Sequence, residues 1–448
     1  MISDVVITGM GAVTPIGDSV ESFWQSNLSG TSGLRLEDEM DLSDLPCGWV
    51  IGVIPDAVKR SIKERWGGRS MGDALTRAAV EQALEDARFE QPLARNAGLI
   101  WVKSCPASGS SPLEYENHMK HQAERYRAAG DDAAAVVEYI RAHSSPPTLA
   151  ESSNIPAEIS KRLGVPVLAS RIEATCAGGL RAIAEAARLL KSGKVDFVIV
   201  TAAVIRRTHY VLSQYGQLMA LSRWKDPPTQ ASMPFDKRRS GMVMSEAAGA
   251  LVLETMDHAK ARGVEEVHAV LGGWGLAVDT AHVTAPRIEM IERVMRTALA
   301  NSEASIEDVD TINAHGTSTR LNDISEARAL HNVFGERMAE LDVCAVKSLT
   351  GHGSGASGII EIIVAALTLC RGVVPPVVTC TEPDPECNVK THLVPAERPI
   401  RTVLKNSFGF GGQYASMIFR RPANPRQHRS YDVSTLSDDR ANARSKLS

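Results

Sequence analysis

Glu173-Ala-Thr-Cys-Ala-Gly-Gly-Leu-Arg-Ala-Ile183 joins a strand pattern to a helix pattern without an intervening loop. The residues at 167–174 predict a strand that leads to Cys176, and residues 177–191 predict a helix that begins directly after it. A thiol at a helix N-terminus is favoured as the thiolate, because the helix dipole and the free N–H groups stabilise negative charge. The same pattern also fits an inert cysteine, since free cysteines are often part of a core.

Strand and helix patterns alternate along the chain on both sides of this segment. Further strands are predicted at 5–13, 98–102, 195–203, 247–254, 267–275, 309–314, 343–346, 403–407 and 414–419. Further helices are predicted at 70–88, 287–300, 323–334 and 359–369. Such alternation predicts an α/β protein with helices packed on its sheets. The element order is similar in an N-terminal half, residues 1–258, and a C-terminal half, residues 266–421.

Two segments differ in kind from the rest of the chain. Residues 112–153 are polar and charged, with two helical patterns, and we expect them to form a surface excursion from the first half. Residues 422–448 are polar and nearly without large apolar side chains, so we expect a disordered tail.

Composition and charge argue against several classes of function. The 448 residues carry 49 Lys and Arg against 53 Asp and Glu, a net charge of −4, and only 5% are aromatic. This balance gives no electrostatic case for nucleic-acid binding and little material for base stacking. The longest apolar stretch, 358–370, is interrupted by Glu361 and is too short to span a bilayer. With no basic segment before its first apolar run and no CxxC pair among seven cysteines, the chain is expected to be soluble and cytoplasmic, with no membrane partner.

Two further strand ends carry groups that are able to do chemistry. Asn313-Ala-His-Gly-Thr-Ser-Thr places His315 after one predicted strand, and Lys347-Ser-Leu-Thr-Gly-His places Lys347 and His352 after another. Each histidine taken alone is more often structural. Active groups of α/β proteins gather at the carboxyl ends of strands, however, and a cysteine joined by two imidazoles there is typical of covalent acyl chemistry.

Two other motifs match binding signatures without the context that those signatures need. Residues 353–358 fit the spacing GxGxxG, but residues 373–381 offer no acidic group for a ribose. His118 and His121 have helical i, i+3 spacing, but no third ligand is evident. We therefore expect neither a dinucleotide site nor a metal site.

The motifs together resemble those of the elongating (KAS II-like) β-ketoacyl-acyl carrier protein synthases, within the thiolase-like superfamily. The resemblance runs from residue 5 to about residue 420. It rests on the opening residues 5–16, on the cysteine segment, on the two histidine segments, on Pro234-Phe-Asp-Lys-Arg-Arg-Ser-Gly, and on Asn406-Ser-Phe-Gly-Phe-Gly-Gly. Six ordered motifs of this kind are highly specific for the superfamily.

The resemblance implies a fold of two similar α/β halves packed in five αβαβα layers. It implies an acyltransferase that condenses a malonyl thioester, with loss of CO2, onto an acyl group held on Cys176. No metal or redox cofactor is implied, since the substrates would travel on the phosphopantetheine of an acyl carrier protein. The implied site comprises catalytic Cys176, His315, His352 and Lys347; the backbone N–H groups of Cys176 and Phe410 as oxyanion hole; supporting Glu361, Asp323 and Glu326; pantetheine-binding Thr317 and Thr319; and gating Phe408 and Phe410.

Three departures from the family pattern bear on the substrate. Ala202-Ala203 stands where the family usually has Gly-Gly, Ser245-Glu-Ala-Ala-Gly249 where it has Gly-Glu-Gly-Ala-Gly, and Gln413-Tyr414 where it has Thr-Asn. They favour polyketide-type secondary metabolism over general fatty-acid elongation. A malonyl-thioester decarboxylase stays open as an alternative. A non-elongating subunit like a chain-length factor, which would lack the nucleophile, is disfavoured by Cys176.

The family resemblance also implies partners. We expect a homodimer, or a heterodimer with a related ketosynthase subunit, and the mostly apolar strand 195–203 is the predicted site of pairing across the dimer axis. A carrier protein with acidic helices would need a local positive surface on a chain of net negative charge. The candidate surface contains Lys59, Arg60, Lys63, Arg65, Arg69, Arg223 and Lys225.

Overall fold

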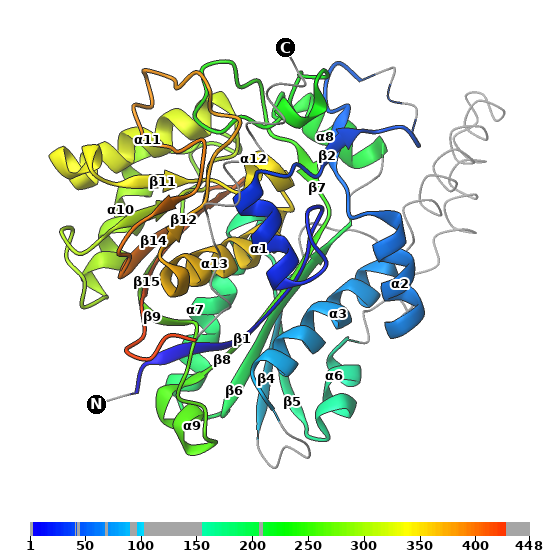
Figure 1. The fold of residues 1–448 in the computed structure, drawn as a ribbon, viewed down its shortest axis with the longest axis vertical. Helices are drawn as coiled ribbons and strands as arrows, with labels where there is room; N and C mark the ends of the chain where they lie inside the picture. Colours follow the sequence, from blue (N-terminus) through cyan, green and yellow to red (C-terminus); the bar gives the residue numbers. More distant parts are fainter. Residues whose placement is uncertain are drawn as a thin grey trace, which may run out of the picture.

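The computed structural model describes residues 3–40, 42, 45–67, 70–89, 96–102, 155–205 and 209–426 (Figure 1). The predicted surface excursion at 112–153, with His118 and His121, and residues 427–448 of the predicted tail lie outside the described residues. The prediction of a disordered tail is wrong for residues 422–426, because Arg426 donates to the carbonyl of Thr8 at 3.1 Å and forms an ion pair with Asp86 at 3.4 Å.

A ten-stranded mixed sheet contains two halves of equivalent strand order. The first half runs in the order β5 (Val167–Ile172), β4 (Ala97–Val102), β6 (Phe197–Val204), β8 (Ala247–Thr255) and β1 (Val5–Val13). The second runs in the order β11 (Asp342–Cys344), β10 (Thr311–Asn313), β14 (Thr402–Gly409), β15 (Gln413–Arg420) and β9 (Ala269–Val278). They meet where Val6 and Ile7 of β1 pair with Val270 and Ala269 of β9. In each half, the outer two strands and their inner neighbour run parallel.

Helices separate and cover the two halves. The central pair is α7 (Gly178–Lys191) and α13 (Ser354–Arg371), which contact each other and strands of both halves. On one outer face lie α2 (Asp56–Trp66), α3 (Met71–Asp86) and α6 (Ile155–Leu163), and on the other α10 (Ile288–Ala300) and α11 (Arg320–Phe334). The five αβαβα layers of the thiolase-like fold are therefore confirmed (Figure 1).

Shorter elements complete the described structure. They are α1 (Val20–Ser29), α8 (His209–Gln217), α9 (Met256–Ala261), α12 (Lys347–Thr350), β2 (Leu34–Leu36), β3 (Val50–Gly52), β7 (Met244–Ser245), β12 (Val373–Val374) and β13 (Ala396–Glu397). The strand β7 pairs with β3 and also bridges to His352, so this small sheet reaches the loop before α13.

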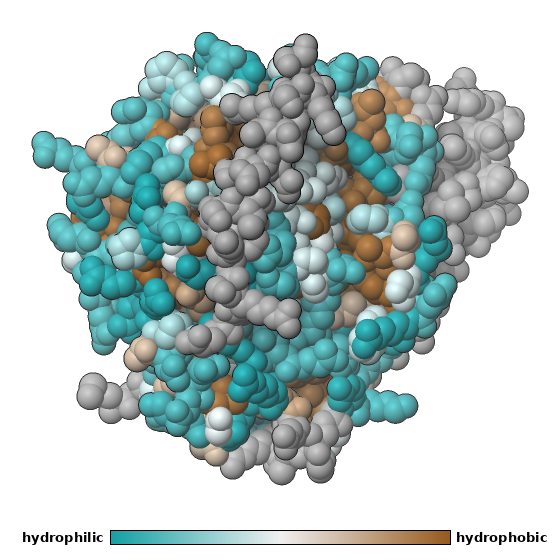
Figure 2. Space-filling view, viewed as in Figure 1, coloured by the Kyte–Doolittle hydropathy of each residue, from teal (hydrophilic) through white to brown (hydrophobic). Residues whose placement is uncertain are grey.

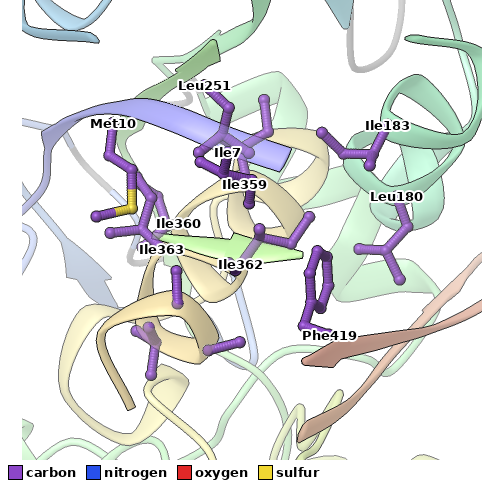
Figure 3. Close-up of a cluster of buried hydrophobic side chains, with 14 of the residues drawn as sticks. Ile7, Met10, Leu180, Ile183, Leu251, Ile359, Ile360, Ile362, Ile363 and Phe419 are labelled. Carbon is purple, nitrogen blue, oxygen red and sulfur yellow. The ribbon is translucent and has the colours of Figure 1, made fainter. Parts of the chain in front are cut away.

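The helix α13 is buried on every side from Ser354 to Leu369, because both sheet halves and α7 surround it. Its isoleucines pack against Ile7 of β1, Leu180 of α7 and Phe419 of β15 (Figure 3). Burying each such side chain contributes about 1.5–3 kcal/mol before entropy is counted. Among the described helices it alone is long and apolar enough to cross a membrane, but 89% of its apolar window is buried in the protein, as in a central core helix.

Glycine allows α7 and α13 to approach each other near their N-termini. A Cβ on Gly179 would lie 2.9 Å from the backbone nitrogen of Ile359, and one on Gly358 would lie 3.2 Å from the Cα of Gly179. Larger residues would force the helices apart. The crossing therefore brings the start of α7, which follows Cys176, beside the start of α13, which follows His352.

The prediction that strand 195–203 pairs with a second subunit is wrong. Residues 195–203 form most of β6, which is paired with β4 on one edge and β8 on the other, so its backbone has no free edge. Its apolar sequence reflects burial inside the sheet. The outer strand β5 pairs only with β4 among the described strands, and Leu168 on it is 50% exposed. Exposed apolar side chains such as Leu168 are common on a protein surface, and the mostly polar face in Figure 2 also carries some.

Candidate active site

Cys176 lies in a single turn of 3-10 helix, Thr175–Ala177, between β5 and α7. Thr175 has φ +44°, which is a strained conformation for a β-branched residue. Its hydroxyl donates to the carbonyl of Phe410 at 3.1 Å, and the hydroxyl of Ser407 donates to the carbonyl of Cys176 at 2.8 Å. The end of β14 thus holds the cysteine turn in place. Cys176 lies two residues before the start of α7 at Gly178, as the sequence predicts.

The two predicted histidines meet at this cysteine. Nε2 of His352 is 3.0 Å from Sγ of Cys176, and the rings of His315 and His352 are 5.4 Å apart, edge to face. The backbone of His352 is fixed by β7, because its N–H donates to Val243 at 2.7 Å and its carbonyl accepts from Ser245 at 3.1 Å. Both imidazoles are 2% exposed.

A buried group of charges lies behind His315. Nζ of Lys347 donates to Glu361, to the carbonyl of His315 at 2.6 Å and to Nδ1 of His315 at 3.4 Å. Because an ammonium only donates, Nδ1 is the acceptor in this contact, and the proton of the neutral ring lies on Nε2. Burial, with Lys347 adding to it, holds the pKa of His315 well below 6.5. His315 is therefore a neutral ring with an Nε2–H donor.

Lys405 is a member of this group that the sequence analysis missed. Its Nζ is 2.8 Å from Glu361 Oε2 and donates to the carbonyls of Asn313 at 3.4 Å and Ala314 at 3.2 Å. Burial lowers its pKa, although Glu361 opposes this effect. Polar residues also flank it in β14, where Asn406 and Ser407 follow directly, so no local pattern in the sequence marks Lys405 as a buried charge.

Two carboxylates at the start of α11 hold the loop that carries His315. Glu326 accepts from the N–H groups of His315 at 2.8 Å and Gly316 at 2.9 Å, and Asp323 accepts from that of Thr317 at 3.1 Å. Burial raises the pKa of Asp323 to about 6, with Arg239 acting in the opposite direction. Both carboxylates therefore lie against the backbone of the loop that carries His315, and their supporting role stays a prediction.

A cavity of about 40 Å³ opens onto the cysteine and both histidines. The predicted residues Thr317, Thr319, Phe408 and Phe410 line it. The two threonine hydroxyls are 2.9 Å apart. The two phenyl rings contact different side chains. The ring of Phe408 lies 5.6 Å from that of His315, and the ring of Phe410 lies 6.1 Å from that of Tyr215.

A second loop in the cavity wall was not found from the sequence. Residues 282–286 line the cavity, and they are joined to the glycine turn after Phe410 by two backbone hydrogen bonds: Asp279 N–H to Gly412 at 2.9 Å and Gly411 N–H to Val283 at 2.8 Å. This contact follows from the register of β9 with β15, which no local pattern shows.

The two unusual residues after the glycine turn both make hydrogen bonds. Gln413 accepts from the Arg181 side chain of α7 at 2.8 Å, and the Tyr414 hydroxyl accepts from the N–H of Arg287 at 2.9 Å. The first bond joins the cysteine helix to the glycine turn, and the second joins β15 to the start of α10. Both residues that depart from the family pattern therefore take part in links around the site.

The other described cysteines lack the surroundings of Cys176. Burial raises the pKa of the thiols of Cys344, Cys370 and Cys387 to about 12, and that of Cys380 to about 11. A thiol that can be acylated, beside two imidazoles that can stabilise an oxyanion, defines a class of enzyme that passes acyl groups through a cysteine.

Comparison with known proteins assigns the chain within that class. Residues 3–259 match the N-terminal domain of beta-ketoacyl synthase and residues 268–381 its C-terminal domain. The 3-oxoacyl-[acyl-carrier-protein] synthase 2 of Staphylococcus aureus (strain COL) is 31% identical over 427 residues, which cover 93% of this chain and 98% of that protein. The chain belongs to the β-ketoacyl synthase family, as the motifs predict.

Two solved structures agree with this assignment. The complex AntDE:AntF, a type II PKS acyl-carrier protein with its ketosynthase bound to the hexaketide, aligns with TM-score 0.78 at 25% identity over 94% of this chain and 99% of that one. The ishigamide ketosynthase/chain length factor aligns with TM-score 0.77 at 27% identity over 96% and 100%. The chain is thus a condensing enzyme of the acyltransferase type.

Proposed function

We propose that this protein is a β-ketoacyl synthase that condenses a malonyl thioester with an acyl group held on Cys176, in polyketide-type metabolism. The observation that carries the proposal is the 3.0 Å contact of Cys176 Sγ with His352 Nε2, with His315 close by. It places a nucleophile and two hydrogen-bond donors on one cavity. The departures at Gln413 and Tyr414, and the likeness to a type II PKS ketosynthase, support that pathway over fatty-acid elongation.

The first half-reaction loads the cysteine. The thiolate of Cys176 attacks the carbonyl of an acyl thioester, and the negative oxygen of the tetrahedral intermediate is held by the N–H groups of Cys176 and Phe410. The intermediate collapses with cleavage of the C–S bond to the carrier. The carrier leaves as a thiolate and takes up one proton, which balances the proton that the Cys176 thiol gave up on ionising, and the enzyme keeps the acyl group.

The second half-reaction makes the carbon–carbon bond. A malonyl thioester binds with its thioester carbonyl against Nε2–H of His315 and His352, which stabilise the enolate as CO2 departs. The enolate carbon attacks the acyl group on Cys176 and releases the sulfur as thiolate. One proton is then taken up per cycle, because the malonyl carboxylate leaves as neutral CO2.

The threonine and phenylalanine side chains that line the cavity suit substrates bound to a carrier protein. We propose that Thr317 and Thr319 bind the phosphopantetheine arm, that Phe408 and Phe410 control entry, and that the protein at the end of the arm is an acyl carrier protein. No step requires a metal or redox group. The proposal also places the protein in the cytoplasm, with structural halves at residues 1–258 and 266–421.

The alternatives differ in what Cys176 does. A decarboxylase would use His315 and His352 on the malonyl thioester without forming an acyl-enzyme. A chain-length-factor-like subunit would use neither step, and the complete set of cysteine and two histidines disfavours it. A related subunit of that kind is nevertheless a candidate partner in a heterodimer, as an alternative to a second copy of this chain.

Intact-protein mass spectrometry with a panel of acyl carrier thioesters tests the proposal. We expect a mass increase that matches the acyl group in the wild type and no increase in Cys176→Ala. Malonyl decarboxylation should persist in part in Cys176→Ala, because the histidines remain. Decarboxylation by the wild type without acyl-enzyme or ketoacyl product would identify the decarboxylase alternative instead.

A further inference from the structure

The hydroxyl of Ser357 contacts the ring nitrogen of His352 that faces away from the cysteine. Ser357 Oγ lies 3.1 Å from Nδ1 of His352, while Nε2 of the same ring is 3.0 Å from Cys176 Sγ. The serine is 7% exposed and lies in the first turn of α13, five residues after the histidine. No role in the reaction described above uses this hydroxyl.

The direction of this hydrogen bond follows from the other contact of the hydroxyl. Ser357 Oγ already accepts the N–H of Gly353 at 2.8 Å. Within the described part of the chain, Nδ1 of His352 is the acceptor available for its single proton, and a buried hydroxyl proton without an acceptor is costly. Donation to Nδ1 satisfies both groups. It leaves the proton of the neutral imidazole on Nε2, which points at the sulfur.

We propose that Ser357 is a positioning residue that sets the tautomer of His352 and makes its Nε2 a hydrogen-bond donor to the reacting groups. The inference rests on the proposed function for its catalytic consequence, but not for the tautomer itself. A neutral histidine donates from one nitrogen only, and the partner of the other nitrogen decides which one. An Nδ1–H ring would present a lone pair to the enolate oxygen and would repel it.

The two histidines then receive the same tautomer from different partners. Lys347 donates to Nδ1 of His315, and Ser357 donates to Nδ1 of His352. Lys347 precedes His352 in the sequence and Ser357 follows it. Ser357 is part of α13, and Lys347 forms an ion pair with Glu361 of the same helix. One central helix thus orients both donors of the site.

The test combines a spectroscopic and a kinetic measurement on the full-length protein. In histidine labelled with ¹⁵N, long-range proton–nitrogen correlations distinguish the two tautomers, and the His352 signal is assigned by its loss in His352→Gln. We expect the Nε2–H pattern in the wild type and a mixed or Nδ1–H pattern in Ser357→Ala. An Nδ1–H pattern in the wild type would overturn the proposal.

The kinetic effect should fall on the condensation step. Ser357→Ala should lower kcat for condensation about tenfold, by analogy with the losses of about 10- to 100-fold seen when the outer partner of a metal-bound histidine is removed. The low end is expected because Ser357 lines a small second cavity of about 10 Å³, where water can enter once the hydroxyl is removed. KM for the malonyl carrier and the acylation of Cys176 should change less than kcat for condensation.

Two further variants separate orientation from general damage. Ser357→Thr keeps the hydroxyl and should keep both the tautomer and most of the rate. Thr368→Val removes a buried hydroxyl of the same helix that has no hydrogen-bond partner among the described residues, and it should leave the rate and the His352 signal unchanged. Full condensation activity in Ser357→Ala with an unchanged His352 signal would contradict the proposal. Absence of condensation in the wild type would contradict the proposed function, while the tautomer would still be measured.

Discussion

His315 shows how burial and neighbouring charge decide the state of one side chain. It is surrounded by Lys347, Lys405 and His352, and it is buried, so a positive charge on its ring is disfavoured. Its low pKa keeps it neutral throughout the neutral pH range. A neutral ring with Nε2–H can stabilise a developing enolate without first losing a proton, which is the state that decarboxylation requires.

Removal of either imidazole should affect the two half-reactions unequally. His315→Ala or His352→Ala each removes one donor from the enolate, and one lost oxyanion donor typically lowers the rate about 100- to 1000-fold. In the proposed mechanism, acylation of Cys176 uses the backbone N–H groups of Cys176 and Phe410 instead, so it should fall less. Rapid-quench measurement of acyl-enzyme formation beside steady-state condensation checks this, and equal losses in both would indicate a structural role.

Asp323 links the protonation of one carboxyl to the stability of the fold. Its folded pKa of about 6 lies above the value of about 3.9 for an unfolded chain, so the folded state binds the proton more tightly. Its contribution to stability is therefore fully present below pH 4 and is lost as the pH rises through 6. Between pH 5 and pH 7 the loss is about 1 kcal/mol.

Asp323→Asn should remove this dependence. From pH 5 to pH 7, its free energy of unfolding should fall by about 1 kcal/mol less than that of the wild type. Urea unfolding at the two pH values measures the difference. Asp308→Asn, at an exposed carboxyl whose pKa is lowered by hydrogen bonds from Ser305, provides a control without the same trend. A parallel pH dependence in wild type and Asp323→Asn would show that Asp323 is ionised in the fold.

At the level of elements, the end of β14 and the turn before α7 fit together only because Gly409 has no side chain. A Cβ there would collide with Oγ1 of Thr175 and would lie 3.0 Å from the nitrogen of Cys176. Two residues later, a Cβ on Gly411 would meet nothing within 4 Å, although its φ is +78°. The two glycines are therefore required for different reasons, the first steric and the second conformational.

Gly409→Ala should move the cysteine turn away from β14 and abolish measurable acylation of Cys176. Gly411→Ala should cost about 1 kcal/mol of stability from its left-handed backbone and should retain acylation. Acyl-enzyme mass spectrometry and thermal unfolding on both variants separate these effects. Normal acylation in Gly409→Ala would mean that the turn tolerates displacement.

The same elements show what the sequence could predict. Cys176, His315 and His352 each follow a strand within a short motif, so local pattern and resemblance were sufficient to predict that they meet. Lys405 and the loop at 282–286 join the site through the pairing of β14 with β15 and of β15 with β9. The strands β9 and β15 lie more than 100 residues apart in the sequence, and no local pattern predicts their register. Apolarity marked β6 as a buried strand, but burial within one subunit and burial between subunits look alike in a sequence.

At the scale of the whole molecule, the outer strand β5 replaces β6 as the proposed site of pairing with a second subunit. Its outer edge is unpaired among the described strands, and Leu168 is half exposed on it. An exposed strand edge with an apolar side chain is a surface that pairs readily with another chain. Leu168→Asp should therefore weaken the dimer, while Leu393→Asp, at a 41% exposed leucine away from β5, should not.

Sedimentation velocity at micromolar concentration measures this effect. We expect a dimer for the wild type and for Leu393→Asp, and a shift toward monomer for Leu168→Asp. A wild-type chain that sediments as a monomer would leave two readings of β5, namely pairing with a different, related subunit or no pairing at all. Co-purification with such a subunit, lost in Leu168→Asp, would decide for the first.

Fewer of the predicted basic residues are available for an acidic carrier protein than the sequence indicated. Lys59 forms ion pairs with Asp56 at 2.9 Å and with buried Glu246 at 3.3 Å, so it is engaged within the protein. Arg60 is exposed on the same helix, α2. Arg69 lies outside the described residues. Lys225 stacks 3.7 Å above the ring of Trp49, and Arg223 is exposed nearby in sequence.

Reversal of charge on α2 should weaken the encounter with an acidic carrier without touching the chemistry. Arg60→Glu combined with Lys63→Glu should raise KM for carrier-bound substrate several-fold, because charge pairs at a rim mainly accelerate association. Turnover of a small pantetheine thioester should be nearly unchanged. The effect should shrink as salt is raised, since exposed charges are screened beyond about 8 Å at physiological ionic strength. Lys260→Glu, on α9 at the far end of the molecule (Figure 1), is the matched control, and an equal effect there would show that only net charge matters.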